Sequence, residues 1–163
     1  MTEKNDITKL SNELTYHRYM INQKQVASLF EDISIPQYIA LHSIAKSISD
    51  KEIEKTYLKD IADELEIPIS NVSKMIAELR ERGLVLWEHE GNGSEGTYVT
   101  ITESGIRLMN QQQTILKNYY SRVIEKFGED KLVLLLKLMK ELEDAMDYEL
   151  SDKGENLNDN RKN

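Results

Sequence analysis

The chain has 163 residues and no cysteine, with 39% hydrophobic residues, 31% charged residues and a net charge of −8 at pH 7. This composition is typical of a folded globular protein, and it excludes disulfides, thiol redox sensing and cysteine-ligated zinc. The acidic balance argues against nonspecific coating of nucleic acid, but the local placement of charge decides specific binding. No apolar run approaches the ~18 residues of a membrane helix. The N-terminus also lacks the apolar core of a signal peptide, so we expect a cytoplasmic protein with no membrane partner.

Two helices are expected in the first third of the chain. From residue 6 to residue 30, apolar residues recur at three- and four-residue steps without Gly or Pro, which predicts one long helix. Ser34 can then cap a second helix, and Pro36 suits its first turn, so we expect residues 36–47 to be helical. The segment SDKEIEKT that follows is charged, and we expect it to form an exposed connector.

The next segment contains two short helical periods, over residues 57–65 and 69–82. The residues expected to face inward are Leu58, Ile61, Ala62, Leu65, Val72, Met75, Ile76 and Leu79. Only the residues EIP separate the two periods, which leaves room for a tight turn alone. Gly83 fits the position that stops the second helix. Two short helices across a tight turn predict a helix-turn-helix.

A β-hairpin is expected directly after this helix pair. Residues 84–90 and 97–102 are rich in β-forming residues, and the sequence EGNGSEG joins them with glycine-rich turn chemistry. A helix-turn-helix followed by a hairpin predicts a winged helix. This wing is unusual because residues 83–106 contain no Lys or Arg, whereas Glu88, Glu90, Glu95 and Glu103 are acidic.

The C-terminal part of the chain is predicted to form two further helices, over residues 104–127 and 129–150, with Gly128 as the break between them. The last helix has a broad apolar stripe, which Val133, Leu134 and Leu138 widen. So wide a stripe at a chain end needs a partner, which the N-terminal helix and a second subunit can supply. The polar tail, residues 151–163, is expected to be disordered.

Over approximately residues 6–150 the sequence resembles the MarR family of bacterial transcriptional regulators. The resemblance lies in YLKDIADELEIPISNVSKMIAELRERGLV, in TYVTITESGIRLM and in the order of the helices. It implies a mainly α fold with a small β-hairpin wing, in which N- and C-terminal dimerisation helices flank a winged helix-turn-helix. The expected divisions are residues 1–55 for dimerisation and support, 56–107 for the winged helix-turn-helix, 108–150 for C-terminal dimerisation helices and 151–163 for the tail. The resemblance further implies a homodimeric, sequence-specific DNA-binding regulator that responds to an effector.

The second helix of the pair offers polar side chains to DNA. Ser70, Asn71, Ser73 and Lys74 lie off its apolar stripe. Asn71 and Lys74 can reach base edges or phosphates in a major groove, and the serines can bond phosphates. Arg80 near the end of this helix and His89 in the wing complete the predicted DNA-binding residues. The plain alternative is that these are solvated positions and that Arg80 and Arg82 complement the helix dipole.

This helix also departs from the family pattern at its start. Pro68 stands where the family has a polar capping residue, and Ile69 stands where the family has a residue that is often polar or basic.

A second candidate site is an effector pocket. Its residues are Tyr16, Tyr19, Met20, Tyr38 and His42 on the first two helices, and the resemblance places effectors of the family in the crevice beside them. The plain alternative is core and interface packing. The three histidines show no metal-ligand spacing, and we see no nucleophile–base pair or phosphate-binding loop. We therefore expect no metal, no cofactor and no enzymatic activity.

Charge keeps two functions open. Residues 56–107 hold five basic and ten acidic side chains, so this segment has a net charge of −5. The first hypothesis is a dimeric regulator that binds double-stranded DNA at a pseudo-palindromic operator. The second is a winged-helix adaptor or antirepressor that binds protein and has little DNA affinity. The polar face around Asn71 and Lys74 favours the first, and the acidic wing favours the second.

Overall fold

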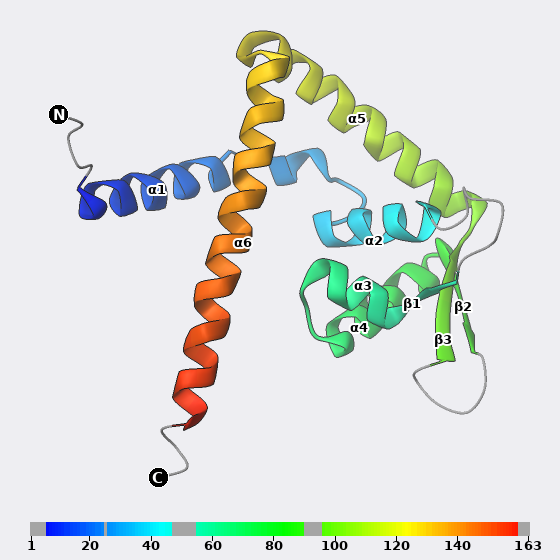
Figure 1. Cartoon of the computed structure of the whole chain (residues 1–163). Helices are drawn as coiled ribbons and strands as arrows, with labels where there is room; N and C mark the ends of the chain where they lie inside the picture. The colour runs from blue at the N-terminus through cyan, green and yellow to red at the C-terminus, as the bar shows by residue number, and fades with distance from the viewer. Residues whose placement is uncertain (1–5, 25, 47–54, 90–95, 160–163) are drawn as a thin grey trace. The chain divides into compact units, whose positions relative to one another are not determined.

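The computed structural model describes residues 6–24, 26–46, 55–89 and 96–159, with side chains as far as Ser151. The elements in chain order are α1 (Ile7–Asn22), the 3-10 helix η1 (Val26–Leu29), α2 (Ile35–Lys46), β1 (Thr56–Tyr57), α3 (Leu58–Leu65), α4 (Ile69–Glu81), β2 (Val85–His89), β3 (Thr97–Ile101), α5 (Glu103–Phe127) and α6 (Glu129–Asp159), as Figure 1 labels them. The chain divides into two compact units, residues 1–116 and 117–163, and α5 crosses the boundary. None of the described helices combines the length and the hydropathy needed to span a membrane.

The start of α2 confirms the predicted cap. The Gln37 N–H donates to the Ser34 hydroxyl at 3.3 Å, and the Ser34 N–H donates to the Gln37 side-chain oxygen at 3.0 Å. This reciprocal pair is a capping box, which satisfies two backbone donors at the helix start. The helix buries Ala40, Leu41 and Ile44 in the core. Its observed bounds, Ile35–Lys46, differ from the predicted 36–47 by one residue at the start, and Ser47 lies outside the described residues.

The N-terminal helix is shorter than predicted. The α1 helix ends at Asn22, where the Gln23 N–H still donates to the Tyr19 carbonyl at 3.0 Å. A separate 3-10 helix, η1, then leads to Phe30, which lies edge-on against Tyr38 with ring centroids 5.8 Å apart. The α1 helix buries none of its residues, whereas Phe30 packs on the core. The prediction of one helix over residues 6–30 was therefore wrong, because tertiary packing of the second half overrides the continuous helical period.

A buried amide fixes η1 to α5. The Gln112 side chain is buried, and its Nε2 donates to the Leu29 carbonyl at 2.9 Å. We expect Gln112→Leu to lower the free energy of unfolding by about 1–3 kcal/mol, because it leaves the part-buried Leu29 carbonyl without this donor. Urea denaturation measures the change, and Gln113→Leu at the exposed neighbouring position is the matched control, with an expected change below about 0.5 kcal/mol. Equal effects of the two substitutions would contradict a structural role for the Gln112 amide.

The helix pair forms as the sequence predicts. Leu58, Ile61 and Ala62 of α3 are buried, and so are Val72, Met75, Ile76 and Leu79 of α4. The α3 helix ends with Glu66 in the left-handed region at φ 52°, and the Ile67 N–H donates to the Ala62 carbonyl at 3.1 Å. The α4 helix ends in the same way around Gly83 at φ +69°, with the Leu84 N–H on the Leu79 carbonyl at 3.0 Å. Both ends are Schellman motifs, so the predicted role of Gly83 is confirmed.

The wing belongs to a three-stranded antiparallel sheet in the order β1-β3-β2. The predicted strands, residues 84–90 and 97–102, are observed as β2 and β3, in which Thr97, Val99 and Ile101 are buried. The strand β1 was missed. Thr56 pairs with Val99 and is buried, although its segment was predicted to be an exposed connector, and Tyr57 lies in the strand rather than in the helix. Two residues are too short to show a strand period, and their pairing partners lie some forty residues later in the chain.

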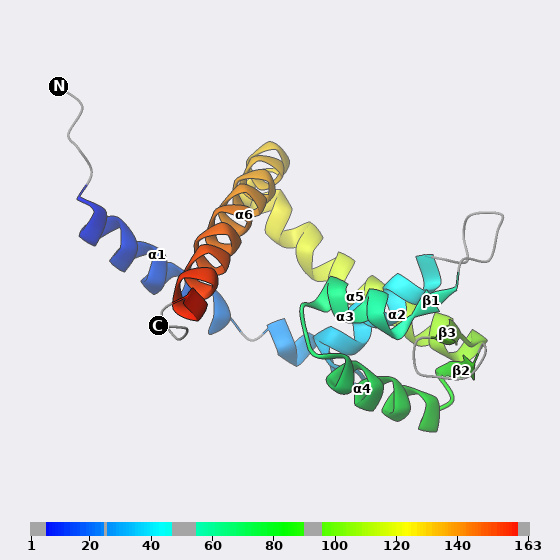
Figure 2. The ribbon, with the colours of Figure 1, turned by 60° about the horizontal axis from the view of Figure 1, so that its bottom comes forward.

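The helices α2, α3 and α4 lie together against this sheet, as Figures 1 and 2 show from two directions. Thr102 joins three elements at the base of the wing. Its hydroxyl lies 2.7 Å from the Gly83 carbonyl and 3.1 Å from the Leu84 carbonyl, and it accepts from the Gly105 N–H at 3.1 Å. The end of α4, the start of β2 and the start of α5 are thus held at one point.

The second unit consists of the end of α5 and the whole of α6. Gly128, at φ +103°, donates its N–H to the Ile124 carbonyl at 2.7 Å and accepts from the Leu132 N–H at 3.0 Å, so it ends one helix and begins the next. The α6 helix continues to Asp159. Residues 151–159 are therefore helical rather than disordered as predicted, since no proline interrupts the α6 backbone hydrogen bonds, and residues 160–163 lie outside the described residues.

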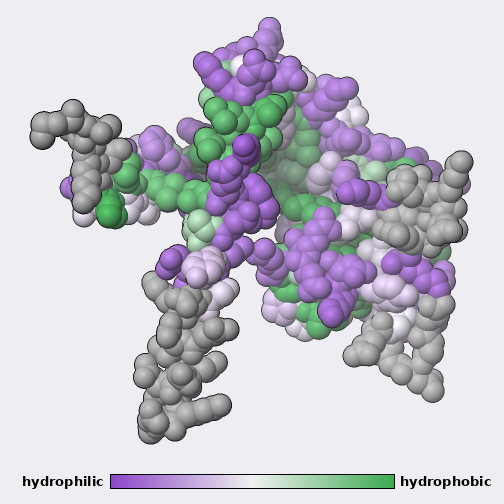
Figure 3. Space-filling model, in the orientation of Figure 1, coloured by the Kyte–Doolittle hydropathy of each residue, from purple (hydrophilic) through white to green (hydrophobic). Residues whose placement is uncertain are grey.

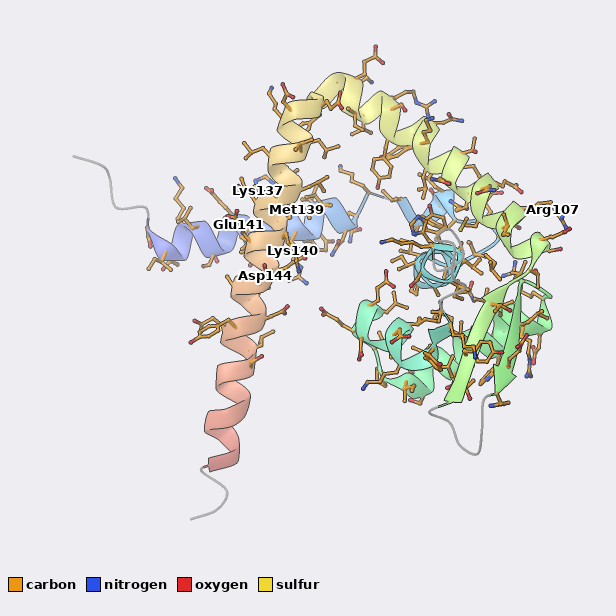
Figure 4. The ribbon with its side chains drawn as sticks, turned by 45° about the vertical axis from the view of Figure 1, so that its right-hand side comes forward. Arg107, Lys137, Met139, Lys140, Glu141 and Asp144 are labelled. Carbon is orange, nitrogen blue, oxygen red and sulfur yellow. The ribbon has the colours of Figure 1, made fainter. Side chains whose placement is uncertain are left out.

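The α6 helix carries an exposed apolar stripe beside a charged face. Among its exposed apolar residues are Val133, Leu134, Leu135, Leu136, Leu138, Met139, Leu142, Met146 and Leu150. Ion pairs join Lys137 to Glu141 at 3.9 Å and Lys140 to Asp144 at 3.0 Å, and the hydrogen bond to Asp144 raises the pKa of Lys140 (Figure 4). The space-filling view shows apolar surface next to a hydrophilic strip on this helix (Figure 3). The stripe has no cover within the described part of its own unit.

Candidate nucleic-acid interface

The α4 helix is anchored by one face and presents the other to solvent. Ser70, Asn71 and Lys74 are exposed, and Ser73 is half-buried. Pro68 precedes the helix and provides no side-chain cap, but its carbonyl accepts from the Asn71 N–H at 2.9 Å. The departure from the family pattern at Pro68 and Ile69 is thus compatible with a regular helix start. Three of the four predicted polar positions on this helix lie together on accessible surface.

The cations of this region differ in their partners. Arg107 pairs with Glu103 at 3.6 Å and donates to the Ser104 hydroxyl at 2.8 Å (Figure 4). In contrast, Lys74, Arg80 and Arg82 are exposed and form no ion pair with any described residue. An unpaired cation can neutralise a phosphate without first giving up a carboxylate. Within residues 56–107, the exposed cations without an ion pair to a described residue are therefore Lys59 on α3 and these three at α4 and its C-terminal end.

A contact between α2 and α4 fixes one flank of the helix. The Gln37 amide that caps α2 also donates from Nε2 to the Glu78 carboxylate at 3.3 Å. Glu78 is two residues before Arg80, so this contact lies near the end of α4 where the wing begins.

The described part of the wing holds its polar side chains in cross-strand pairs. The His89 Nδ1 lies 2.8 Å from the Thr97 hydroxyl, and the Tyr98 hydroxyl donates to Glu88. The Trp87 ring lies 6.2 Å from the His89 ring. The Arg80 guanidinium lies over the Trp87 ring, 5.4 Å from the ring centroid. The predicted wing tip, with Glu90 and Glu95, lies outside the described residues.

One family matches the chain, that of the winged helix DNA-binding domain, over residues 34–105. These residues comprise α2, β1, the α3–α4 pair and the three-stranded sheet, and they end in the first turn of α5. Residues 34–105 therefore have the winged helix fold, and we call them the winged helix domain. Among curated proteins, none matches the chain.

Solved structures of MarR regulators share the fold of most of this chain. A MarR family regulator from Neisseria meningitidis has a TM-score of 0.67 and 18% identity, over 89% of this chain and 98% of its own. A mutant MarR from E. coli, complexed with operator DNA, also has a TM-score of 0.67, with 19% identity over 85% of this chain and 99% of its own. The PcaV regulator from Streptomyces coelicolor, in complex with its natural ligand, has a TM-score of 0.62 and 14% identity over 89% and 96%. The predicted MarR-type fold, mainly helical with a small wing, is confirmed.

The residues predicted for an effector pocket are only partly brought together. Next to the winged helix domain's core, Tyr38 lies between Phe30 and His42, with ring centroids 5.8 and 6.3 Å away. Burial raises the pKa of the Tyr38 phenol above its ordinary value, at which a phenol is already protonated at neutral pH. Tyr16 and Tyr19 on α1 are 58% and 59% exposed, and Met20 is half-buried. Among the described residues, no group of three or more His, Asp or Glu could hold a metal.

The winged helix domain has two contacts that the sequence analysis missed. Gln37 links α2 to α4, and Trp87 lies beneath Arg80. The strand period offered a signal for the second, because Trp87 shares the inward side of β2 with Val85. No signal within the sequence pointed to the first, since the pair is separated by 41 residues.

Proposed function

We propose that the protein is a transcriptional regulator of the MarR type, and not an enzyme, which acts in the cytoplasm as a homodimer on a pseudo-palindromic operator. One observation carries the proposal. The α4 helix of a winged helix DNA-binding domain presents exposed Ser70, Asn71 and Lys74, while its opposite face is buried in the core. Amide and ammonium groups at these positions suit the base edges and phosphates of a major groove.

The homodimer is supported by the exposed apolar side chains of α1 and α6. Ile7, Leu10 and Leu14 of α1 are exposed, as are the leucines of α6. Apolar stripes of this width on two helices are characteristic of surfaces that a second subunit covers. In such a dimer each subunit contributes one recognition helix, which requires half-sites about one helical turn apart.

An effector response is a further part of the proposal. The solved PcaV regulator is in complex with its natural ligand, which supports a ligand site in this fold. In the present chain, the neutral Tyr38 hydroxyl and the exposed His42 imidazole are the polar groups of the predicted pocket that lie near each other. We propose that they line the pocket together with Tyr16, Tyr19 and Met20 of α1.

Substitutions on α4 test DNA recognition. We expect Asn71→Ala to lose about 1–3 kcal/mol of discrimination at one base position if its amide makes a bidentate contact, and Lys74→Ala to weaken binding to every sequence alike. The measurement is binding to fragments selected from the source genome and to their single-base variants. Lys117→Ala, which removes an exposed cation outside the winged helix domain, is the control. Wild-type affinity and specificity in both α4 variants would show that α4 is not the recognition helix.

The alternative is a winged-helix adaptor that binds protein, and one observation favours it. The winged-helix segment, residues 56–107, has a net charge of −5. If the wild-type protein binds no genomic fragment at low salt, in the absence of an effector, the adaptor function replaces the regulator.

A further inference from the structure

The hairpin of the winged helix domain has no Lys or Arg side chain with which to bind a DNA phosphate. Residues 83–106 contain neither Lys nor Arg, so His89 is the only side chain of the hairpin that can carry a positive charge. The nearest basic side chains before the hairpin are Arg80 and Arg82, at the end of α4. Of these two arginines, only Arg80 lies over an aromatic ring among the described residues, and this ring belongs to Trp87, the single tryptophan of the chain. On the β1 side of the sheet, Lys55 lies over the Tyr98 ring, 4.7 Å from its centroid.

The position of Arg80 on α4 directs it toward the wing. Residues three and four apart share one side of a helix, so Ser73, Ala77 and Arg80 follow one another along a single flank. The Gln37–Glu78 hydrogen bond marks the other flank, which faces α2. On the wing, Trp87 pairs with Val99 and packs partly against the core. The Arg80 guanidinium, 5.4 Å above the indole ring, therefore bridges α4 and β2.

This geometry restrains the guanidinium without neutralising it. An aromatic face attracts a guanidinium and restricts its motion, but it leaves the five N–H donors and the full charge available. A carboxylate partner would compete with phosphate, and Arg80 has none among the described residues. A planar fork held in one orientation suits bidentate binding of a phosphate, because less rotamer entropy is lost on binding.

We propose that Arg80, positioned by the Trp87 ring, binds a DNA backbone phosphate at the junction of α4 and β2. It supplies the wing-side phosphate contact for which the hairpin has no Lys or Arg. Trp87 is a positioning residue in this arrangement and Arg80 is the binding residue. The inference rests on the proposed DNA-binding function.

The first experiment compares two neighbouring arginines. Arg80→Gln and Arg82→Gln remove the same charge from the same end of α4, and only the first removes the contact with Trp87. For the full-length dimer on a selected operator, Arg80→Gln should weaken binding about tenfold or more. It should also make the slope of log K against log salt shallower by about 0.9 for each subunit. Arg82→Gln should change the affinity about twofold or less, because an uncontacted surface charge is screened.

The second experiment tests the part played by Trp87. Arg80→Lys keeps the charge but loses the planar fork, so it should retain most of the salt slope while losing affinity. In the Trp87→Leu background, Arg80→Gln should reduce operator affinity by a smaller factor than it does in the wild type. In the Trp87→Phe background, which keeps an aromatic face, the factor should be close to that in the wild type. Circular dichroism and thermal melts identify variants that fold, and the Arg80→Lys comparison does not depend on any change at Trp87.

The outcomes separate this inference from the proposed function. If the wild type binds an operator and Arg80→Gln behaves as Arg82→Gln does, the inference is overturned and the regulator function stands. If Arg80→Lys has wild-type affinity, or if Arg80→Gln costs the same with and without Trp87, the positioning role of the indole is overturned. If the wild type binds no DNA, both proposals fail together.

Discussion

Replacing Leu135 and Met139 of α6 together with glutamine is expected to dissociate the proposed dimer. These side chains lie one helical turn apart near the centre of the apolar stripe, and they are 41% and 47% exposed in the single chain. Fully burying a Leu or Met side chain contributes about 1.5–3 kcal/mol, so the half still exposed contributes about 1 kcal/mol. Four such side chains in a dimer contribute about 4 kcal/mol, which corresponds to a roughly thousandfold increase in the dimer Kd.

Sedimentation over a dilution series measures this Kd, and operator binding should fall with it because a monomer reads one half-site. The control is Lys137→Gln with Glu141→Gln, which has the same spacing on the same helix, removes one pair of exposed charges and leaves the net charge unchanged. The control should remain dimeric. A double variant at Leu135 and Met139 that dimerises as tightly as the wild type would exclude this stripe from the interface.

Gly105→Ala is expected to destabilise the winged helix domain strongly, although it adds only one methyl group. A Cβ at this position would lie 2.2 Å from the Leu84 carbonyl oxygen and 2.7 Å from Cγ1 of Ile101. The first of these atoms is backbone, so no side-chain rotation relieves the contact. Overpacking costs about 1–3 kcal/mol and occasionally more. We place this substitution at the upper end of that range, before the gain in helix propensity of about 1 kcal/mol from replacing a glycine.

The net loss in the free energy of unfolding should be about 2 kcal/mol, measured by urea denaturation. Ser104→Ala, at the exposed neighbouring position, is the control and should change stability by about 0.5 kcal/mol or less. A Gly105→Ala protein as stable as the wild type would mean that the backbone around Leu84 can move to accept the Cβ without loss of stability. The free energy of DNA binding by this variant should fall by more than its free energy of unfolding, because the wing and α4 share this junction.

Features set by local chemistry were predictable from the sequence. The inward residues of α3 and α4 follow the helical period, and the Ser34 cap and the Gly83 stop follow from the chemistry of single residues. The separate helix η1 was not predictable from the local pattern, since its Leu29 contacts Gln112 more than eighty residues later in the chain. The strand β1 was not predictable for the same reason, because it is defined by its pairing with β3, a distant part of the chain.

For the candidate interface, the sequence identified the exposed polar face of α4 through the positions that the apolar stripe leaves free. It could not show which cations are unpaired, because ion pairing depends on side-chain geometry. Arg107 and Arg80 have the same charge and lie at opposite ends of the wing segment, yet one is tied to Glu103 and the other lies over Trp87.

The Thr102 hydroxyl has a mechanical consequence for a dimer. Through it, the end of β3, the stop of α4 and the first turn of α5 are hydrogen-bonded at one point. A change in the tilt of the first half of α5 would carry α4 with it as a single body instead of bending the chain between them. In the proposed dimer, each recognition helix would then follow the first turn of α5, so a contact that shifts this turn would change the spacing of the two helices on DNA.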